Sequence, residues 1–557
     1  MELMRFCIVT ALALGPLALA SGHGDSSSDE DLRKQVHELQ SEVSHFREQL
    51  AAYRAELEAT AFQATMEQPM MARHHGRRMS APVVDPWAGS PSATDSIWLL
   101  LCGSLVMFMQ CGFAMLEAGS CRAKNAQHIL LKNLMDVCVG TLGWWFCGWA
   151  FAYGGPFKDG YVENKFIGSK QFFASGFMKQ DSEGIQTPDG DGGKMLSWFF
   201  QWAFCSAAAT IVSGGVAERV RFPGYGIYSF LMTAFIYPVV VCWTWGYGWL
   251  AGSAEDGYIN KVGYMDFAGS GVVHMTGGVG ALVGAICAGP RTGRFEQSGS
   301  GGPVSSWGEG TGSGESEWDA HSVPLQVLGT FILWFGWYGF NCGSTLGLSD
   351  AKTGALAAQV AMNTTIAAAT GGLTVFFAKF GIFKKYDVGG LCNGILAGLV
   401  SITAPCGNVE TGFAFLIGFI GGFIYLGSSV ALKKMKIDDP LDAFPVHGAC
   451  GAWGVLAAGF FDWGKNFDHT HGWSGFDCVT GDDGTCMDGG NGLMIAANIV
   501  EILCITLWVA GLSLLIFLPL RMAGLLRTSD EVQKVGGDAT HHSPIKAYEG
   551  ILPKASN

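Results

Sequence analysis

The sequence predicts an all-α polytopic membrane protein with about eleven transmembrane helices, because apolar segments near 20 residues long recur along it. Hydrophobic residues make up 49% of the 557 residues and charged residues only 15%, whereas soluble domains carry about a quarter charged residues. The fifth and tenth segments each contain a histidine near their start, preceded by an acid. This repeat predicts two inverted five-helix halves, since an odd number of spans reverses the second half.

Residues 1–20 have the parts of a secretory signal peptide. Arg5 supplies the positive end, an apolar stretch follows, and residues 18–20 (Ala-Leu-Ala) fit the cleavage site. A short uncleaved anchor is the alternative. Cleavage would leave the new N-terminus outside the cell membrane.

Residues 21–62 contain a heptad pattern, with apolar residues spaced alternately by four and three and charged residues between them. The apolar positions are Leu32, Val36, Leu39, Val43, Phe46, Leu50, Tyr53 and Leu57. The pattern predicts an external coiled coil, and a lone amphipathic helix is the alternative. We expect three copies to form a stalk, joined to the membrane by a linker over residues 63–94, which are rich in Met, Pro and Ser.

A membrane domain is predicted over residues 95–527. Its expected spans are 96–118, 130–153, 196–216, 227–250, 270–289, 324–347, 355–378, 390–405, 412–432, 446–462 and 493–520. Short loops after the odd-numbered spans carry clusters of Lys and Arg, at residues 122–124, 219–221, 291–294, 384–385 and 433–436, whereas most opposite loops are acidic or carry few cations. By the positive-inside rule these loops are cytoplasmic, which predicts an external N-terminus and a cytoplasmic tail over residues 528–557.

The segment from Asp266 to His274 is the first candidate site. Eight residues on one helix are a little over two turns, so both side chains are expected on one face. An ionisable residue inside a span is a functional candidate by default. A histidine bonded to a neighbouring carbonyl is the alternative.

The second candidate site is His447, which follows Asp442 by five residues. In inverted halves His274 would enter from outside and His447 from inside, so both could reach the middle of the membrane. Aromatic segments near Phe204, Trp245 and Phe340 could form a cation cage, or an aromatic belt at the membrane interface.

Cys478 and Cys486 flank a polar loop, unlike most of the 16 cysteines. A disulfide between them is expected if the loop faces an oxidising compartment.

At these motifs the sequence resembles the ammonium transporter, methylammonium permease and Rhesus family. The matching segments are 217–222 (Ala-Glu-Arg-Val-Arg-Phe), 266–274, 336–341, 393–403 and 439–447. Because both Trp245 and Ser344 are present, the ammonium transporter branch fits better than the Rhesus branch. The resemblance implies an eleven-helix protomer in a homotrimer, within the lipid bilayer and with one pore in each protomer.

The resemblance also implies a role for each matching residue. Trp245, Ser344, Phe204 and Asp266 would bind the substrate, and Asp266 would support its deprotonation. Phe204 and Phe340 would form the pore gate. His274 and His447 would be the pore histidines. Thr540 would be a regulatory threonine of the tail. Cys242 stands where many members of the family have a histidine. At Thr540 the alternative to a regulatory threonine is an unmodified polar tail.

The expected function is ammonium transport. NH4+ would be recruited at the outer aromatic site and deprotonated, and NH3 would pass the histidines with or without the proton. Methylammonium is a second expected substrate. The sequence shows no metal cluster, nucleotide loop or nucleophile triad, so we expect no cofactor and no enzyme activity, and no basic face suggests nucleic acid. A sensor is the rival function, but only about 30 residues follow Arg527 to form a signalling module.

Overall fold

A computed structural model describes residues 91–158, 161–180, 182, 184–251, 263–295, 318–462, 479–480, 486–487, 493–545 and 547–548. The predicted signal peptide and coiled coil lie outside these residues, as does nearly all of the predicted linker. Cys478 also lies outside them, so its disulfide with Cys486 stays a prediction.

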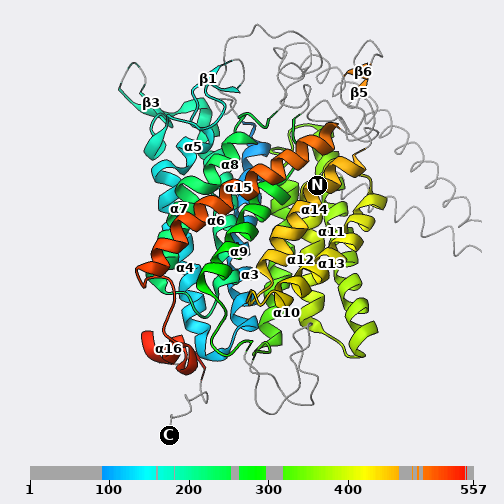
Figure 1. Ribbon diagram of the computed structural model, residues 1–557. Coiled ribbons are helices and arrows are strands. Elements are labelled where there is room, and N and C mark those ends of the chain that lie inside the picture. Colours follow the sequence, from blue (N-terminus) through cyan, green and yellow to red (C-terminus); the bar gives the residue numbers. More distant parts are fainter. Residues whose placement is uncertain are drawn as a thin grey trace, which may run out of the picture. The chain divides into compact units, whose positions relative to one another are not determined.

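Helices form most of the described structure (Figure 1). The helical elements are α3 (Ala93–Ser120), η2 (Ala123–Asn125), α4 (Ala126–Gly143), η3 (Trp144–Gly148), α5 (Trp149–Tyr153), η4 (Phe172–Ala174), η5 (Asp189–Gly192), α6 (Gly193–Val216), α7 (Phe222–Leu231), η6 (Met232–Ile236), α8 (Tyr237–Trp243), η7 (Ser270–Met275), α9 (Thr276–Ala288), α10 (Val323–Trp337), η8 (Tyr338–Cys342), α11 (Ala351–Phe383), α12 (Val388–Thr403), α13 (Thr411–Lys434), η9 (Phe444–Ala449), α14 (Cys450–Phe461), α15 (Leu493–Met522), α16 (Asp530–Val535) and α17 (Gly537–His541). The strands form three antiparallel pairs: β1 (Phe157–Lys158) with β2 (Tyr161–Val162), β3 (Met178–Gln180) with β4 (Gln186–Pro188), and β5 (Val479–Thr480) with β6 (Cys486–Met487).

Among the described residues, ten helical segments are long and apolar enough to cross a membrane, and α12 is a shorter apolar helix of 16 residues. These segments match the predicted spans in order, which confirms the all-α polytopic fold. The fourth span differs at its end, because α8 stops at Trp243 rather than near residue 250. There Gly246 and Gly248 let the chain fold back on Cys242. A methyl group added at Gly246 would lie 2.8 Å from Cys242 Cα, and one added at Gly248 would lie 2.3 Å from the Cys242 carbonyl oxygen.

Small residues allow the helices to pack closely. A methyl group added to Gly398 of α12 would lie 2.1 Å from the Ala367 carbonyl oxygen of α11. One added to Gly278 of α9 would lie 2.2 Å from the backbone nitrogen of Gly448 in η9. Such approaches let van der Waals packing hold helices together where lipid offers no hydrophobic drive between them. The Gly278–Gly448 contact also joins the two segments that carry the predicted pore histidines.

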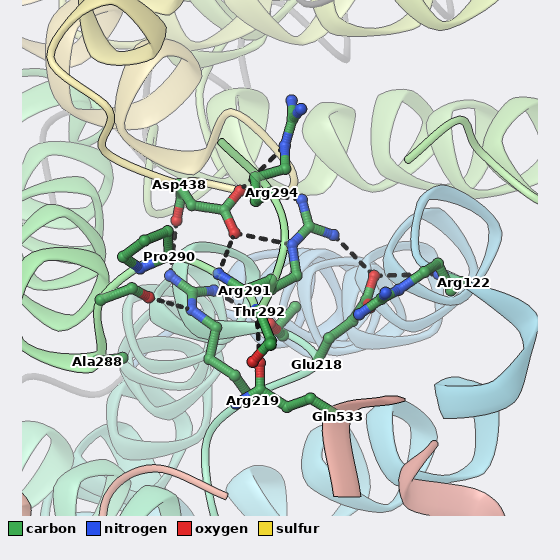
Figure 2. A network of polar contacts seen from close by, with 12 residues as sticks. Arg122, Glu218, Arg219, Ala288, Pro290, Arg291, Thr292, Arg294, Asp438 and Gln533 are labelled. Carbon is green, nitrogen blue, oxygen red and sulfur yellow. Dashed lines mark hydrogen bonds and ion pairs between the residues drawn. The ribbon is translucent and has the colours of Figure 1, made fainter. Parts of the chain in front are cut away.

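A buried network of charges connects the loops at the end of the bundle where α16 lies (Figures 1 and 2). Arg291 donates from Nη1 to Glu218 at 2.8 Å and from Nε to Asp438 at 2.8 Å. Glu218 also pairs with Arg122, and the Arg219 guanidinium donates to the Asp438 carbonyl oxygen at 2.6 Å. Burial opposes ionisation of Glu218, but Arg291 and Arg122 outweigh it and hold its pKa below the usual value.

The C-terminal tail docks on the start of α4. The Asp538 carboxylate accepts the backbone N–H groups of Gln127 and His128, both at 3.0 Å. A carboxylate at this position satisfies free N–H groups and complements the helix dipole. The imidazole rings of His128 and His542 approach to 3.2 Å, nitrogen to nitrogen. Gln533 of α16 accepts from the Thr292 backbone N–H at 3.1 Å, which connects the tail to the charge network of Figure 2.

Candidate functional site

Three predicted site residues lie in π-helical turns inside the membrane-spanning helices. His274 is in η7, Phe340 in η8 and His447 in η9. A π turn inserts one extra residue into a helix, and such turns occur frequently at functional sites. η7 leads directly into α9, and η9 leads in the same way into α14, so the two histidines begin equivalent helices of the two halves.

The structure brings the predicted aromatic and histidine residues into one continuous row. Ring centroids lie 4.1 Å apart between Phe204 and Phe340, 5.1 Å between Phe340 and His274, and 5.2 Å between His274 and His447. Trp245 meets Phe204 edge to face at 6.0 Å. Trp245 is only half-buried, whereas His274 is fully buried, so the row leads inward from a partly accessible end.

The two histidines form a direct contact, with their Nδ1 atoms 3.2 Å apart. In a hydrogen bond of this kind one ring donates and the other accepts, so the neutral pair shares one proton at this contact. Among the described residues, His274 Nε2 has no hydrogen-bond partner. The His274 ring also stacks on Trp337 at 5.0 Å, and the Trp337 indole N–H donates to the Thr403 hydroxyl at 2.9 Å. These contacts fix the plane of the His274 imidazole.

Trp245 and Ser344 lie just beyond the ends of their helices. The Trp245 indole N–H donates to the backbone carbonyl of Asp266 at 3.0 Å. The Ser344 hydroxyl donates to the Phe340 carbonyl at 2.9 Å, which leaves its oxygen able to accept from a ligand. Both side chains are half-buried. These hydrogen bonds hold Trp245 against the backbone of Asp266 and Ser344 against the backbone of Phe340.

Asp266 does not share a helical face with His274, so this prediction was wrong. The helix begins only at Ser270, after Gly269 adopts the left-handed φ of 108°. The Asp266 carboxylate folds back and accepts four backbone N–H groups, from residues 269, 270, 271 and 272, at 2.8 to 3.0 Å. These are the N–H groups that a helix start leaves unsatisfied. Asp266 therefore stabilises the start of the His274 helix.

The equivalent acid in the second half is Asp439, which the sequence interpretation missed. Its carboxylate accepts the backbone N–H groups of Ala443 and Phe444 at 3.0 and 2.8 Å. Asp442, which the sequence interpretation paired with His447, bonds instead to hydroxyl groups on α13. Burial and the nearby Asp442 charge raise the pKa of Asp439 to about 6. Spacing was the available signal, since Asp266 and Asp439 each stand eight residues before their histidine.

Within the described part of the chain, no group of three or more His, Cys, Asp or Glu side chains could hold a metal ion. Thr540 lies far from the row, in α17 of the docked tail, and its side chain is exposed. Its hydroxyl donates to the carbonyl oxygens of Gly536 and Gly537 at 3.0 and 3.1 Å.

A bundle of spanning helices around a buried row of aromatic and imidazole rings is typical of a polytopic membrane transporter. The model of the Ammonium Transporter Family matches residues 97–547. The chain is 39% identical to ammonium transporter 1 member 1 of Oryza sativa subsp. japonica over 466 residues, covering 82% of this chain and 86% of that protein. It is 38% identical to ammonium transporter Amt2 of Archaeoglobus fulgidus, covering 82% and 89%.

Comparison with solved structures indicates the same family. A protein described as a sensor Amt protein matches with a TM-score of 0.64 and 30% identity, covering 80% of this chain and 96% of that one. Candida albicans Mep2 matches with a TM-score of 0.63 and 26% identity, covering 81% and 89%. The chain belongs to the ammonium transporter family. Ammonium transport across a membrane is therefore its function, and the family is one of transporters rather than enzymes.

Proposed function

We propose that this chain recruits NH4+ beside Trp245 and Ser344, removes a proton there, and conducts NH3 past Phe204 and Phe340 to His274 and His447. One observation carries the proposal. Two phenyl rings and two imidazole rings lie in contact as one buried row that begins at the half-buried Trp245.

Recruitment relies on an aromatic face, a hydroxyl acceptor and a nearby negative charge. A cation over the Trp245 ring is attracted by its π electrons, by ~0.5–2 kcal/mol depending on desolvation. Ser344 can accept an N–H bond from ammonium, which potassium cannot donate. The carboxylate of Asp266 adds a negative charge close by, because Trp245 is bonded to the backbone of that residue. These features favour NH4+ over a potassium ion of similar size.

Deprotonation lowers the barrier to crossing. Beyond Trp245 the row consists of buried rings, and a bare ion in such surroundings faces a large desolvation cost. NH3 is neutral, so most of that cost disappears when the proton is lost. At the end of the row, the histidine pair can donate to ammonia with one ring and accept with the other. Return of the proton through this pair would make transport electrogenic, and release to the outside would make it neutral.

We predict that ammonium uptake persists in a large excess of potassium, because only ammonium can satisfy the Ser344 acceptor. The measurement is ammonium-dependent current or labelled methylammonium uptake in a transport-deficient cell, with and without potassium. A Trp245→Leu variant should lose uptake several-fold while the protein still reaches the membrane. Trp508→Leu, a half-buried tryptophan of α15 outside the row, is the matched control. Equal competition by potassium would contradict the proposed selectivity.

We also propose that three protomers assemble as a homotrimer in the cell membrane, with the N-terminus outside and the tail in the cytoplasm. The family resemblance supports the trimer, and methylammonium would be a second substrate of the same site. The proposed orientation is supported by the cationic loops at the end of the bundle where α16 lies, since Arg122, Arg219, Arg291 and Arg294 gather there.

Thr540 is proposed as a regulatory phosphorylation site. The Thr540 side chain is exposed and stands two residues after Asp538, whose carboxylate anchors the tail on α4. A phosphate adds about 1.5 to 2 negative charges. Like-charge repulsion with Asp538 would weaken the docked tail, and the tail is linked through Gln533 to the loop that follows α9.

A Thr540→Asp variant should release the tail and lower transport several-fold, because the introduced charge repels Asp538. Thr540→Val, which removes the hydroxyl without adding charge, is the control and should retain most of the transport. Hydrogen exchange over residues 530–541 measures docking directly. If Thr540→Asp transports as well as the unchanged protein with its tail still protected from exchange, the proposed switch is incorrect.

A further inference from the structure

α15 carries a buried acid that the proposed path does not use. Glu501 is 0% exposed, and among the described residues neither of its carboxylate oxygens has a hydrogen-bond partner. An ionised carboxylate in such a place costs a great deal of free energy, and buried acids avoid this cost by retaining a proton.

Glu501 faces Asp266 across the start of the His274 helix. A methyl group added at Gly271 would lie 3.0 Å from Glu501 Oε1 and 3.3 Å from Asp266 Oδ2. The two acids therefore approach the same point of the backbone from opposite elements. Val455 Cγ2 also approaches this point, at 2.8 Å, and residue 271 itself carries no side chain there.

The position of Glu501 is fixed by a neighbour on the same face of α15. Asn498, three residues earlier, donates to the carbonyl oxygens of Met265 and Val455 at 3.2 and 2.7 Å. Its side-chain oxygen accepts the Met265 backbone N–H at 2.7 Å. Residues three apart on a helix lie side by side. Asn498 thus ties this face of α15 to the residue directly before Asp266.

The two acids have different surroundings. Asp266 receives four backbone N–H bonds, which favour its charged form. Glu501 receives none, and a second negative charge beside Asp266 would be repelled. Such a pair holds one proton in common and titrates as a unit. The proton belongs on Glu501, because ionisation of Asp266 is stabilised by its N–H donors.

The pair is close enough to the proposed ammonium site to influence it. The Trp245 indole N–H bonds to the Asp266 carbonyl, and a methyl group added at Gly269 would lie 2.8 Å from the Trp245 ring. Half-buried Tyr264 lies on the same outer segment. Burial raises the pKa of the Tyr264 phenol, and the charges of Glu501 and Asp266 raise it further.

We propose that Glu501 and Asp266 form a coupled carboxyl pair in which Glu501 binds and releases the shared proton, so that Glu501 sets the pH dependence of ammonium recruitment. With Glu501 protonated the pair carries one negative charge beneath Trp245. Loss of that proton to the external water adds a second negative charge, which strengthens attraction for NH4+. Glu501 is thus a positioning residue that acts through Asp266, and its role rests on the proposed recruitment at Trp245.

The test compares the unchanged protein with Glu501→Gln, which resembles the protonated acid in size and shape. The KM for ammonium is measured in vesicles containing purified protein, between about pH 5 and 8, where ammonium remains almost entirely a cation and carboxyl groups of raised pKa titrate. The KM of the unchanged protein should fall several-fold as pH rises. Glu501→Gln should match it at acid pH and then stay flat. Glu410→Gln, at an exposed acid, is the control and should keep the normal profile.

A Glu501→Gln profile identical to that of the unchanged protein would overturn the proposal. Infrared spectroscopy adds a readout that is independent of transport, since a protonated carboxyl at Glu501 gives a band that Glu501→Gln and Glu501→Met both lack. Absence of a protonated glutamate band from the unchanged protein at about pH 5, where the proposal requires Glu501 to hold the proton, also overturns the proposal, even if neither variant folds. If the unchanged protein shows the band but takes up no ammonium, the proposed recruitment at Trp245 is contradicted. The inference that Glu501 holds a proton is then still supported.

Discussion

Replacing Asp266 with alanine should nearly abolish ammonium transport while the protein still folds and reaches the membrane. The substitution removes the acceptor of four backbone N–H groups at the start of the His274 helix. It also removes the negative charge beside Trp245. A loss of ~3 kcal/mol at the site corresponds to a ~100-fold lower rate. Radiolabelled methylammonium uptake, normalised to the protein present in the membrane, is the measurement.

Two further variants separate the causes. Asp266→Asn keeps one oxygen acceptor but no charge, so its rate should fall between the alanine variant and the unchanged protein. Asp350→Ala is the matched control, because Asp350 also accepts two backbone N–H groups at a helix start but is exposed. Loss of such a cap costs ~1 kcal/mol of stability, and transport should be unaffected. Normal transport by Asp266→Ala would remove Asp266 from the site.

The spans were predictable because the bilayer requires long apolar helices, and their order in the structure matches the sequence. Inverted halves predicted that His274 and His447 could both reach the middle of the membrane, and the family resemblance implied that they pair. Their Nδ1 contact of 3.2 Å agrees with that expectation.

Backbone detail at the helix starts was not predictable from periodicity. A helical period places Asp266 and His274 on one face, but Gly269 ends the helix before Asp266 is reached. The same reasoning chose Asp442 over Asp439, because residue spacing does not reveal which acid folds back onto free N–H groups. The π turns at His274, Phe340 and His447 also leave no mark in a pattern of apolar residues.

Glu501 shows a signal that the sequence carried and the interpretation missed. It stands alone among apolar residues, in Ile499-Val-Glu-Ile-Leu503. An ionisable residue inside a span is a functional candidate by the same rule that singled out His274. Only the structure places it opposite Asp266, because residues 266 and 501 are brought together by the packing of α15 on α9 and η7.

Replacing His274 or His447 with glutamate should allow potassium to pass, at least ~10-fold above the unchanged protein, because a fixed negative charge offsets part of the desolvation cost of a cation. His274 is fully buried and its neighbours in the row are rings, so a cation entering the unchanged protein meets no compensating charge there. A glutamate placed at this depth would itself resist ionisation. The potassium current should therefore grow as the pH rises and the introduced carboxyl loses its proton.

The measurement is potassium current across membranes containing each variant, recorded at several pH values. The matched controls are His274→Gln and His447→Gln, which can hydrogen-bond but carry no charge, and these should continue to exclude potassium. Because the two rings are in contact, a new charge at either position would reach the same part of the row. Unchanged potassium exclusion in both glutamate variants, at a pH where the carboxyl is ionised, would mean that neither histidine lines the path. A potassium current in only one variant would place the path along that histidine alone.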